Sequence, residues 1–415
     1  MVPSPSSDEE TTRNGPLAGI KVIDMSQAIA GPYAAMLLAD LGANLIKIEP
    51  PWGDHVRTSL PKLEEDEAYG GYFQSVNRSK RSVCIDLTSE SGQQALKDLV
   101  ADSDIVLENF RGEGVTDKLG VSYSDLKEVR EDIIYASITG FGHKQVMESP
   151  HSGKRTVDMV SQAMGGLMGV TGSEESGPTK VGPGIGDIFP GTLSVVGILA
   201  ALAHRDRTGE GQLVDVAMVD SILSLCDTRM IHYSYTGENP DLPGNTHPYN
   251  FPYDVFDSAD GPVVIAAIND KMWKELCNAI KKPELANEYS TDENRKENQD
   301  VLYEEINDWT KEQSRHKIME QLSDHMPVGP LYRAEGIFDD EHFESREMLV
   351  DVPHANTGKT AKIAGTPIKF SNTPAGIQHR APLLGEHTRD ALEEIGYDDD
   401  TIDSMFESGD ILESE

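Results

Sequence analysis

The stretch IKVIDMSQAIAGPYAAMLLADLGANLIKIE (20–49) decides the fold class of this 415-residue chain. Its two ends, residues 20–25 and 44–49, are short apolar runs with β-branched residues, which is typical of buried strands. Between them, residues 33–41 are helix-forming, and Gly42 follows where that helix would end. A strand, a helix and a strand at this spacing predict a βαβ unit, and therefore a parallel sheet with helices on its faces.

The same alternation continues along the chain. Further strands are predicted at 82–87, 104–109, 133–139 and 211–217, and helices at 89–100, 192–204 and 219–235. Residues 237–252 are rich in Gly, Pro and Asn, which indicates a linker or a binding loop. After it, a strand at 262–268 and helices at 272–280 and 301–322 predict a second, smaller unit, and a last helix starts near Thr388.

Charge excludes several classes of function. The chain has 36 Lys and Arg against 71 Asp and Glu, a net charge of −35, so nucleic acid and anionic membranes would be repelled.

Hydrophobic segments long enough for a membrane span are not expected, since the sequence has no apolar stretch of about 18 residues. Residues 1–16 lack the apolar core of a signal peptide. With Cys84, Cys226 and Cys277 far apart, we expect reduced thiols in a cytoplasmic protein.

The acidic residues run from Asp8 to Glu415 instead of gathering in one tail. A basic binding partner would explain an acidic surface, and so would life in multimolar salt, where self-repulsion is screened within a few ångström. The even spread favours the second interpretation, and we predict a salt-requiring, halophilic protein.

Motifs for common chemistries are missing from the sequence. There is no HExxH pair, so we expect no metal site, and no GxSxG nucleophile elbow.

Several longer segments together carry a family signature. They are GPYAAMLLADLGANLIKIEPPWGDHVR (31–57), NRSKRSVCIDL (77–87), IVLENFRGEGVTDKLG (105–120), SITGFG (137–142), VDMVSQAMGGLMGVTG (157–172), GIGDIFPG (184–191), HRDRTGEGQLVDVAMVDSIL (204–223) and APLLGEHT (381–388). In this order, over residues 16–400, the chain closely resembles the class III CoA-transferases, a superfamily that includes formyl-CoA transferase, carnitine CoA-transferase and α-methylacyl-CoA racemase.

The resemblance implies covalent catalysis by an aspartate, which passes through a mixed anhydride and an aspartyl-CoA thioester. The matching residue is Asp187, which follows Gly186 in a glycine-rich stretch. Glycines there let the backbone approach the coenzyme and can offer N–H groups to an oxyanion. Asp187 could instead cap the helix expected near Thr192, but its distance from that residue argues against a cap. Asp158 matches a second acid of the family that helps to position the acyl group, or it begins a helix.

The resemblance also implies residues that bind the coenzyme, which is a substrate here and not a permanently bound cofactor. They are Ala28, Lys80, Asn109, Phe110, Arg111, Lys118, Arg155 and Gly186. Arg57 and Arg111 could equally be salt-bridge partners on the surface. Gln27 and His247 are weaker candidates for holding a carboxylate of the acid substrate.

Two branches of the family fit less well. The racemase branch needs a His before the Asp158 position, where this chain has Val157. The formyl-transferring branch has Gln before Ala-Gly-Pro and a glycine-tetrad lid, whereas this chain has Ile29 there and no tetrad in 244–253. Salt-adapted organisms have routes that need mesaconyl-CoA, so we expect succinyl-CoA as donor and mesaconate as acceptor, with itaconate or malate next. Formyl-CoA or carnitine transfer, racemisation and non-catalytic acyl-CoA binding remain the alternatives.

The architecture follows from the resemblance. It implies an α/β fold with a Rossmann-like large domain, a smaller α/β domain and an interlocked homodimer. We expect a flexible acidic arm at 1–15, the first part of the large domain at 16–225, the small domain with its linkers at 226–335, and a C-terminal return at 336–415 that completes the large domain.

Overall fold

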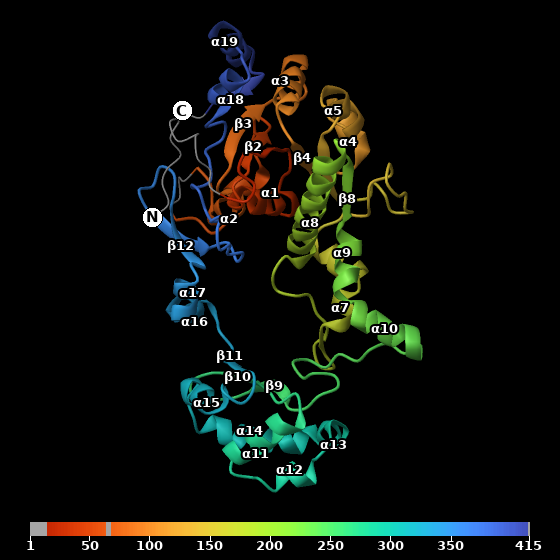
Figure 1. Cartoon of the computed structure of the whole chain (residues 1–415), viewed down its shortest axis with the longest axis vertical. Coiled ribbons are helices and arrows are strands. Elements are labelled where there is room, and N and C mark those ends of the chain that lie inside the picture. Colours follow the sequence, from red (N-terminus) through yellow and green to blue (C-terminus); the bar gives the residue numbers. More distant parts are fainter. Residues whose placement is uncertain (1–14, 64–67, 414–415) are drawn as a thin grey trace. The chain divides into compact units, whose positions relative to one another are not determined.

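The computed structural model describes residues 15–63 and 68–413, and apart from Gly15 the predicted arm lies outside them. The described residues form two compact units (Figure 1). The first unit takes in residues 15–167, 180–234 and 342–413, and the second 168–179 and 235–341. The predicted domain limits at 226 and 335 stay a prediction.

The first unit is built on a seven-stranded sheet in the order β14-β3-β2-β1-β4-β5-β8. The strands are β1 (Lys21–Asp24), β2 (Asn44–Glu49), β3 (Arg81–Ile85), β4 (Ile105–Glu108), β5 (Ile134–Thr139), β8 (Leu213–Ala217) and β14 (Ile411–Leu412). Six run parallel, and β14 adds an antiparallel edge on β3. The parallel strands follow the order of dinucleotide-binding sheets, which confirms the predicted α/β class. Chain order reverses between β1 and β4, and such sheets bind ligands at the carboxyl ends of the strands at that point.

Helices cover this sheet on both sides, as its parallel connections require. They are α1 (Ala30–Asp40), α2 (Gly71–Asn77), α3 (Glu90–Ala101), α4 (Glu113–Leu119), α5 (Tyr123–Val129), α6 (Asp158–Met164), α8 (Ile185–Thr208), α9 (Met218–Leu225), α18 (Thr388–Glu394) and α19 (Asp399–Ser408). A short 3-10 helix spans His55–Thr58, and β12 (Leu349–Pro353) pairs with β13 (Thr360–Ala364). Helices α7 (Leu167–Val170), α10 (Asp227–Thr236) and α17 (Glu341–Ser345) lie where the chain passes between units.

The βαβ unit predicted from residues 20–49 is confirmed as β1, α1 and β2. Helix α1 begins at Ala30, earlier than predicted, because Pro32 is accommodated in the first helical turn. The predicted helix at 219–235 is wrong as one element, since it divides into α9 and α10 at Cys226.

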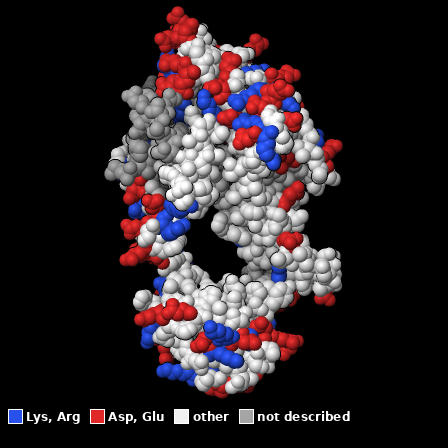
Figure 2. Space-filling view, in the orientation of Figure 1, with Lys and Arg blue, Asp and Glu red and all other residues white. Residues whose placement is uncertain are grey.

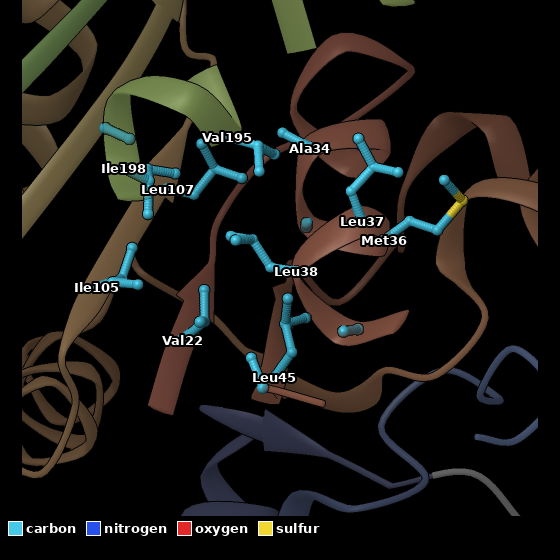
Figure 3. Close-up of a cluster of buried hydrophobic side chains, with 14 of the residues drawn as sticks. Val22, Ala34, Met36, Leu37, Leu38, Leu45, Ile105, Leu107, Val195 and Ile198 are labelled. Carbon is cyan, nitrogen blue, oxygen red and sulfur yellow. The ribbon is translucent and has the colours of Figure 1, made fainter. Parts of the chain in front are cut away.

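The core between α1, α8 and the sheet is apolar and closely packed (Figure 3). Leu38 from α1 and Ile198 from α8 are fully buried there, together with Leu45 and Ile105 from the strands. Helices α1 and α8 approach each other closely at Gly191. A Cβ on this glycine would lie 2.6 Å from the carbonyl oxygen of Ala30, so the approach requires a residue without a side chain. This packing fixes the N-terminal half of α8 against the first turn of α1.

Helix α8 is also long and apolar enough to cross a membrane by length and composition, which the sequence analysis did not foresee. Its buried side chains, including Val195 and Leu202, belong to the core of the first unit. A helix of the protein core passes the same test.

The second unit has its own core. A three-stranded antiparallel sheet in the order β11-β10-β9 packs with helices around Trp273, Leu276 and Leu302. Its elements are β9 (Tyr253–Phe256), β10 (Val263–Ala266), β11 (Val328–Pro330), α11 (Asp270–Ala279), α12 (Leu285–Glu288), α13 (Asp292–Glu297), α14 (Gln299–Lys311), α15 (Arg315–Leu322) and α16 (Ala334–Asp339), with the short hairpin of β6 (Gly172–Ser173) and β7 (Gly177–Pro178). The predicted helix at 301–322 is two helices, α14 and α15.

Candidate active site

Two carboxylates meet where α6 and α8 begin, both within the first unit. Asp158 is the first residue of α6, and Asp187 lies in the first turn of α8. The N–H of Gly186 donates to Asp158 Oδ1 at 2.8 Å. A Cβ at Gly186 would lie 2.6 Å from the Asp158 carbonyl oxygen, so a glycine is needed for this approach. The N–H of Gly186 is thus used by Asp158 in this structure, and the expectation that glycines here serve an oxyanion or the coenzyme stays a prediction.

Burial, and then the charge of Asp158, raise the pKa of Asp187 from 3.8 to about 6. At neutral pH the side chain is therefore mostly ionised and more basic than an ordinary aspartate. Its carboxylate accepts no hydrogen bond from the residues that the structure describes. It is thus held in place by its helix and left available for reaction.

The position of Asp187 in α8 corrects part of the sequence argument. Because α8 begins at Ile185 and not near Thr192, Asp187 does lie in a first helical turn, and the distance argument against a helix cap was wrong. Gly184 occupies the N-cap position, however, and makes no side-chain cap. The absence of a hydrogen bond to the Asp187 carboxylate from the described residues now argues against a capping role.

The loops after β1 and β4 are tied together at the point where strand order reverses. The Asn109 side chain accepts from the N–H of Gln27 at 2.9 Å and donates to the carbonyl oxygen of Gln27 at 2.8 Å. Ala28 has a positive φ of 67°, and its N–H points to the buried Asp54 carboxylate at 3.3 Å. The N–H of Phe110 donates to Glu108. Gln27, Ala28, Asn109 and Phe110 are thus brought together at the expected ligand-binding edge.

Three of the predicted coenzyme-binding cations are exposed. Arg111 precedes Gly112, and a Cβ on Gly112 would lie 3.4 Å from the Cα of Gly153, so the loop of Arg111 lies beside the segment that leads to Arg155. Lys118 is exposed in the last turn of α4. None of the three forms an ion pair with a residue in the described part of the chain. They are available to an anionic ligand.

Lys80 is placed differently. It is fully buried, and its ammonium donates to Asp24 (2.9 Å), to the carbonyl of Pro32 (3.0 Å) and to Asn77 (3.0 Å). Burial lowers its pKa to about 8. With its three donors in use, Lys80 supports α1 and β1 from inside the fold, and this conformation gives it no donor for a coenzyme phosphate. Arg57 is likewise buried, paired with Glu49 at 2.6 Å, and is not a surface salt-bridge partner.

His247 belongs to the second unit, where its ring stacks on Tyr253 with centroids 5.1 Å apart. Lys296 donates to the His247 carbonyl oxygen at 2.8 Å. Its predicted contact with the acid substrate stays a prediction. Among the described residues, no group of three or more His, Cys, Asp or Glu is arranged to hold a metal.

Two residues near the carboxylates were missed in the sequence. Tyr72 in α2 has a pKa that is raised by burial and then by Asp187 and Asp158, which places its hydroxyl in the field of both. Gln162, fully buried in α6, donates to both carboxylate oxygens of Asp158. The spacing of Gln162 four residues after Asp158 on a predicted helix was the one available signal.

A parallel sheet with linked loops at its switch point, and a half-buried pair of carboxylates where α6 and α8 begin, define the class of protein. The family model described as CoA-transferase family III matches residues 17–388. The chain belongs to this family, and it is a CoA-transferase, an enzyme that uses CoA thioesters as substrates.

Individual members of the family are similar to this chain over nearly its full length. The chain is 46% identical to the succinyl-CoA:mesaconate CoA-transferase of Haloarcula hispanica, over 92% of this chain and 97% of the relative. It is 45% identical to the enzyme of the same name from Haloarcula marismortui, over 93% of this chain and 98% of the relative. A solved structure of a CAIB/BAIF family protein from Brucella suis has a TM-score of 0.82 and 35% identity, covering 92% of this chain and 100% of that one.

Proposed function

We propose that this enzyme transfers CoA from succinyl-CoA to mesaconate through an aspartyl-CoA thioester on Asp187. The observation that carries the substrate assignment is the 46% identity, over nearly the full length, to a transferase named for that reaction. The position of Asp187 in a pair of carboxylates supports the mechanism.

In the first half of the proposed reaction, an Asp187 carboxylate oxygen attacks the thioester carbonyl of succinyl-CoA. The C–S bond breaks, CoA thiolate leaves, and a mixed succinyl–aspartyl anhydride forms. The thiolate then attacks the side-chain carbonyl of Asp187. Succinate leaves, and the enzyme holds CoA as a thioester. The energy of the first thioester is kept in the second, so the exchange needs no other energy source.

The second half reverses these steps with the acceptor. A mesaconate carboxylate attacks the Asp187 carbonyl and expels CoA thiolate, which gives a mesaconyl–aspartyl anhydride. The thiolate attacks the mesaconyl carbonyl, and mesaconyl-CoA leaves with Asp187 restored as a carboxylate. No net proton is taken up in either half.

The raised pKa of Asp187 suits this role. A carboxylate with a pKa of about 6 is a better nucleophile than an ordinary aspartate, yet it is still mostly ionised near neutral pH. In the proposal, the exposed Arg111, Lys118 and Arg155 neutralise the coenzyme phosphates. In an otherwise acidic protein, cations that form no ion pair with the described residues are suited to that task.

We also propose that the enzyme is a cytoplasmic, halophilic homodimer. Large apolar side chains are exposed on α6, α8 and α10 and just before α6, and exposed apolar side chains that gather on a surface are typical of protein–protein contacts. They include Val157 (63% exposed), Met159 (51%), Val196 (59%), Ile231 (48%) and Tyr233 (53%). A second copy of the chain could bury this surface.

An assay with a panel of acids tests the substrate assignment. The purified enzyme in multimolar KCl is given succinyl-CoA with mesaconate, itaconate, malate, glutarate or oxalate, and acyl-CoA products are separated by chromatography. We expect mesaconyl-CoA to form with the highest kcat/KM. Faster transfer to oxalate would favour the formyl-type branch instead, and binding of succinyl-CoA without exchange would favour a non-catalytic protein.

A further inference from the structure

Gln162 links Asp158 to the chain segment that leads to Asp187. Its side-chain amide nitrogen lies 2.9 Å from Asp158 Oδ1 and 3.0 Å from Oδ2. Its amide oxygen accepts the N–H of Val181 at 2.9 Å. One buried side chain therefore joins the first turn of α6 to the segment that enters α8 and carries Asp187.

Asp158 is fixed by neutral donors alone in this arrangement. Its Oδ1 takes hydrogen bonds from Gln162 and from the N–H of Gly186, and Oδ2 takes one from Gln162. No Lys or Arg of the described residues forms an ion pair with it. Its negative charge is therefore not cancelled locally, and it acts on Asp187 from a fixed position.

We infer that Gln162 is a positioning residue, which keeps the Asp158 carboxylate directed at Asp187 so that the pair can catalyse CoA transfer. This inference rests on the proposed role of Asp187. It assigns to Gln162 an effect on catalysis that is transmitted through Asp158 and involves no contact with substrate.

The chemistry of the amide explains why glutamine occupies this site. A carboxamide supplies a donor to Asp158 and an acceptor to Val181 at the same time. An ionised Glu would offer no donor and would add a like charge, while Leu would remove the hydrogen bond to Val181 and leave Asp158 with the Gly186 N–H as its remaining donor among the described residues. Among the described residues, Tyr72 from α2 is the titratable group whose pKa responds to both carboxylates. In the loop before α8, the ammonium of Lys180 donates to the carbonyl oxygens of Val181 and Gly182, both at 3.3 Å.

A double-mutant cycle separates this role from simple structural support. Gln162→Leu is made in the wild-type enzyme and in the Asp158→Ala variant, and the rate of transfer from succinyl-CoA to mesaconate is measured from pH 5 to 8. If Gln162 acts through Asp158, its substitution has no carboxylate to misplace in the second background, and the two effects are not additive.

We expect Gln162→Leu alone to lower kcat roughly tenfold to a hundredfold, as small misplacements of catalytic groups do, with KM for succinyl-CoA within about threefold. The acid limb of its kcat/KM profile should move to lower pH. A displaced Asp158 carboxylate no longer raises the pKa of Asp187 by its negative charge. In the Asp158→Ala background the same substitution should change kcat less than about threefold.

Controls keep the result interpretable. Gln313→Leu removes another buried glutamine, in the second unit, whose amide nitrogen donates to the Trp309 carbonyl, and should leave the acid limb in place. If Gln162→Leu does not fold, Gln162→Met replaces it, with circular dichroism as the check on folding.

Three outcomes would overturn the inference. They are an unchanged kcat in folded Gln162 variants, a loss of kcat that is equal in both backgrounds, and a loss without any shift of the acid limb. Asp187→Asn is assayed in parallel. If that variant keeps full turnover, the proposed function itself has failed and the role of Gln162 falls with it, whereas an inactive Asp187→Asn with normal Gln162 variants refutes the inference about Gln162 alone.

Discussion

Asp187 and Asp158 form a coupled pair whose chemistry depends on burial. A carboxylate taken out of water resists ionisation, and a neighbouring negative charge adds to that resistance. Both causes act on Asp187, and burial is the larger of the two. If Asp187 is the nucleophile, as proposed, the activity of the enzyme should therefore fall as pH drops through about 6, where its carboxylate takes up a proton.

Asp158→Asn tests the smaller of these causes. Removing the negative charge lowers the pKa of Asp187, so the acid limb of kcat/KM should move down by about 0.5–1 pH unit. Asp206→Asn, which removes an exposed acid near the other end of α8, serves as the matched control and should leave the limb in place. An acid limb that stays put in Asp158→Asn would show that the two carboxylates do not interact as the structure indicates.

Helices α6 and α8 meet through a contact that tolerates no side chain. A Cβ at Gly186 would lie 2.6 Å from the Asp158 carbonyl oxygen and 2.9 Å from its Oδ1. We expect Gly186→Ala to lower the free energy of unfolding by about 1–3 kcal/mol and to reduce kcat, because the two helix ends must separate. Urea unfolding in multimolar KCl measures the first effect.

Gly184→Ala is the matched control for that substitution. Its added Cβ would find its nearest atom, Asp187 Oδ2, at an ordinary 3.6 Å, so its unfolding free energy should stay within about 1 kcal/mol of wild type. Equal stability of Gly186→Ala and wild type would contradict the close approach of α6 and α8.

The loops after β1 and β4 depend on one side chain. Asn109→Ala removes both hydrogen bonds to the Gln27 backbone, and each such bond contributes about 1 kcal/mol. We expect KM for succinyl-CoA to rise about tenfold, with a smaller change in kcat. Asn44→Ala, at the opposite, amino end of β2, should leave KM unchanged, and an unaltered KM in Asn109→Ala would place the coenzyme elsewhere.

The sequence predicted elements well where the signal is local. Hydrophobic periodicity was enough for β1, α1 and β2, because each buries a regular apolar face. It failed at the start of α8, where Gly184, Gly186 and Pro190 indicate a loop and packing against α1 and α6 overrides that preference.

The candidate site was predictable to a similar degree. Resemblance singled out Asp187 and Asp158, whose roles stay a prediction. The contact between Asn109 and the Gln27 backbone at the switch point was not predicted. Lys80 shows what the sequence could not predict. The sequence reveals that this residue is charged, but not that its ammonium is buried and donates to three buried acceptors. Gln162 is uncharged and was given no role from the sequence. It was singled out by its hydrogen bonds to Asp158 and Val181, which the structure shows.

The whole molecule carries a large excess of negative charge. Figure 2 shows Asp and Glu gathered toward the ends and margins of the visible face, with Lys and Arg among them. Net charge of −35 destabilises a compact chain through self-repulsion unless salt screens it.

We therefore expect the enzyme to lose structure in dilute buffer. Circular dichroism at a series of KCl concentrations should show a thermal midpoint that rises steadily with salt, and turnover should follow it. A protein that is fully folded and active at about 0.05 M salt, where the Debye length exceeds 10 Å, would contradict the halophilic interpretation.

The covalent intermediate on Asp187 is the most direct test of the account. The enzyme is mixed with succinyl-CoA without an acceptor, quenched, digested and examined by mass spectrometry, with and without hydroxylamine. We predict that the peptide containing Asp187 carries CoA, that hydroxylamine converts this adduct to a hydroxamate at Asp187, and that Asp187→Asn yields neither. An enzyme that turns over at full rate while CoA is found on another residue, or on none, would contradict it.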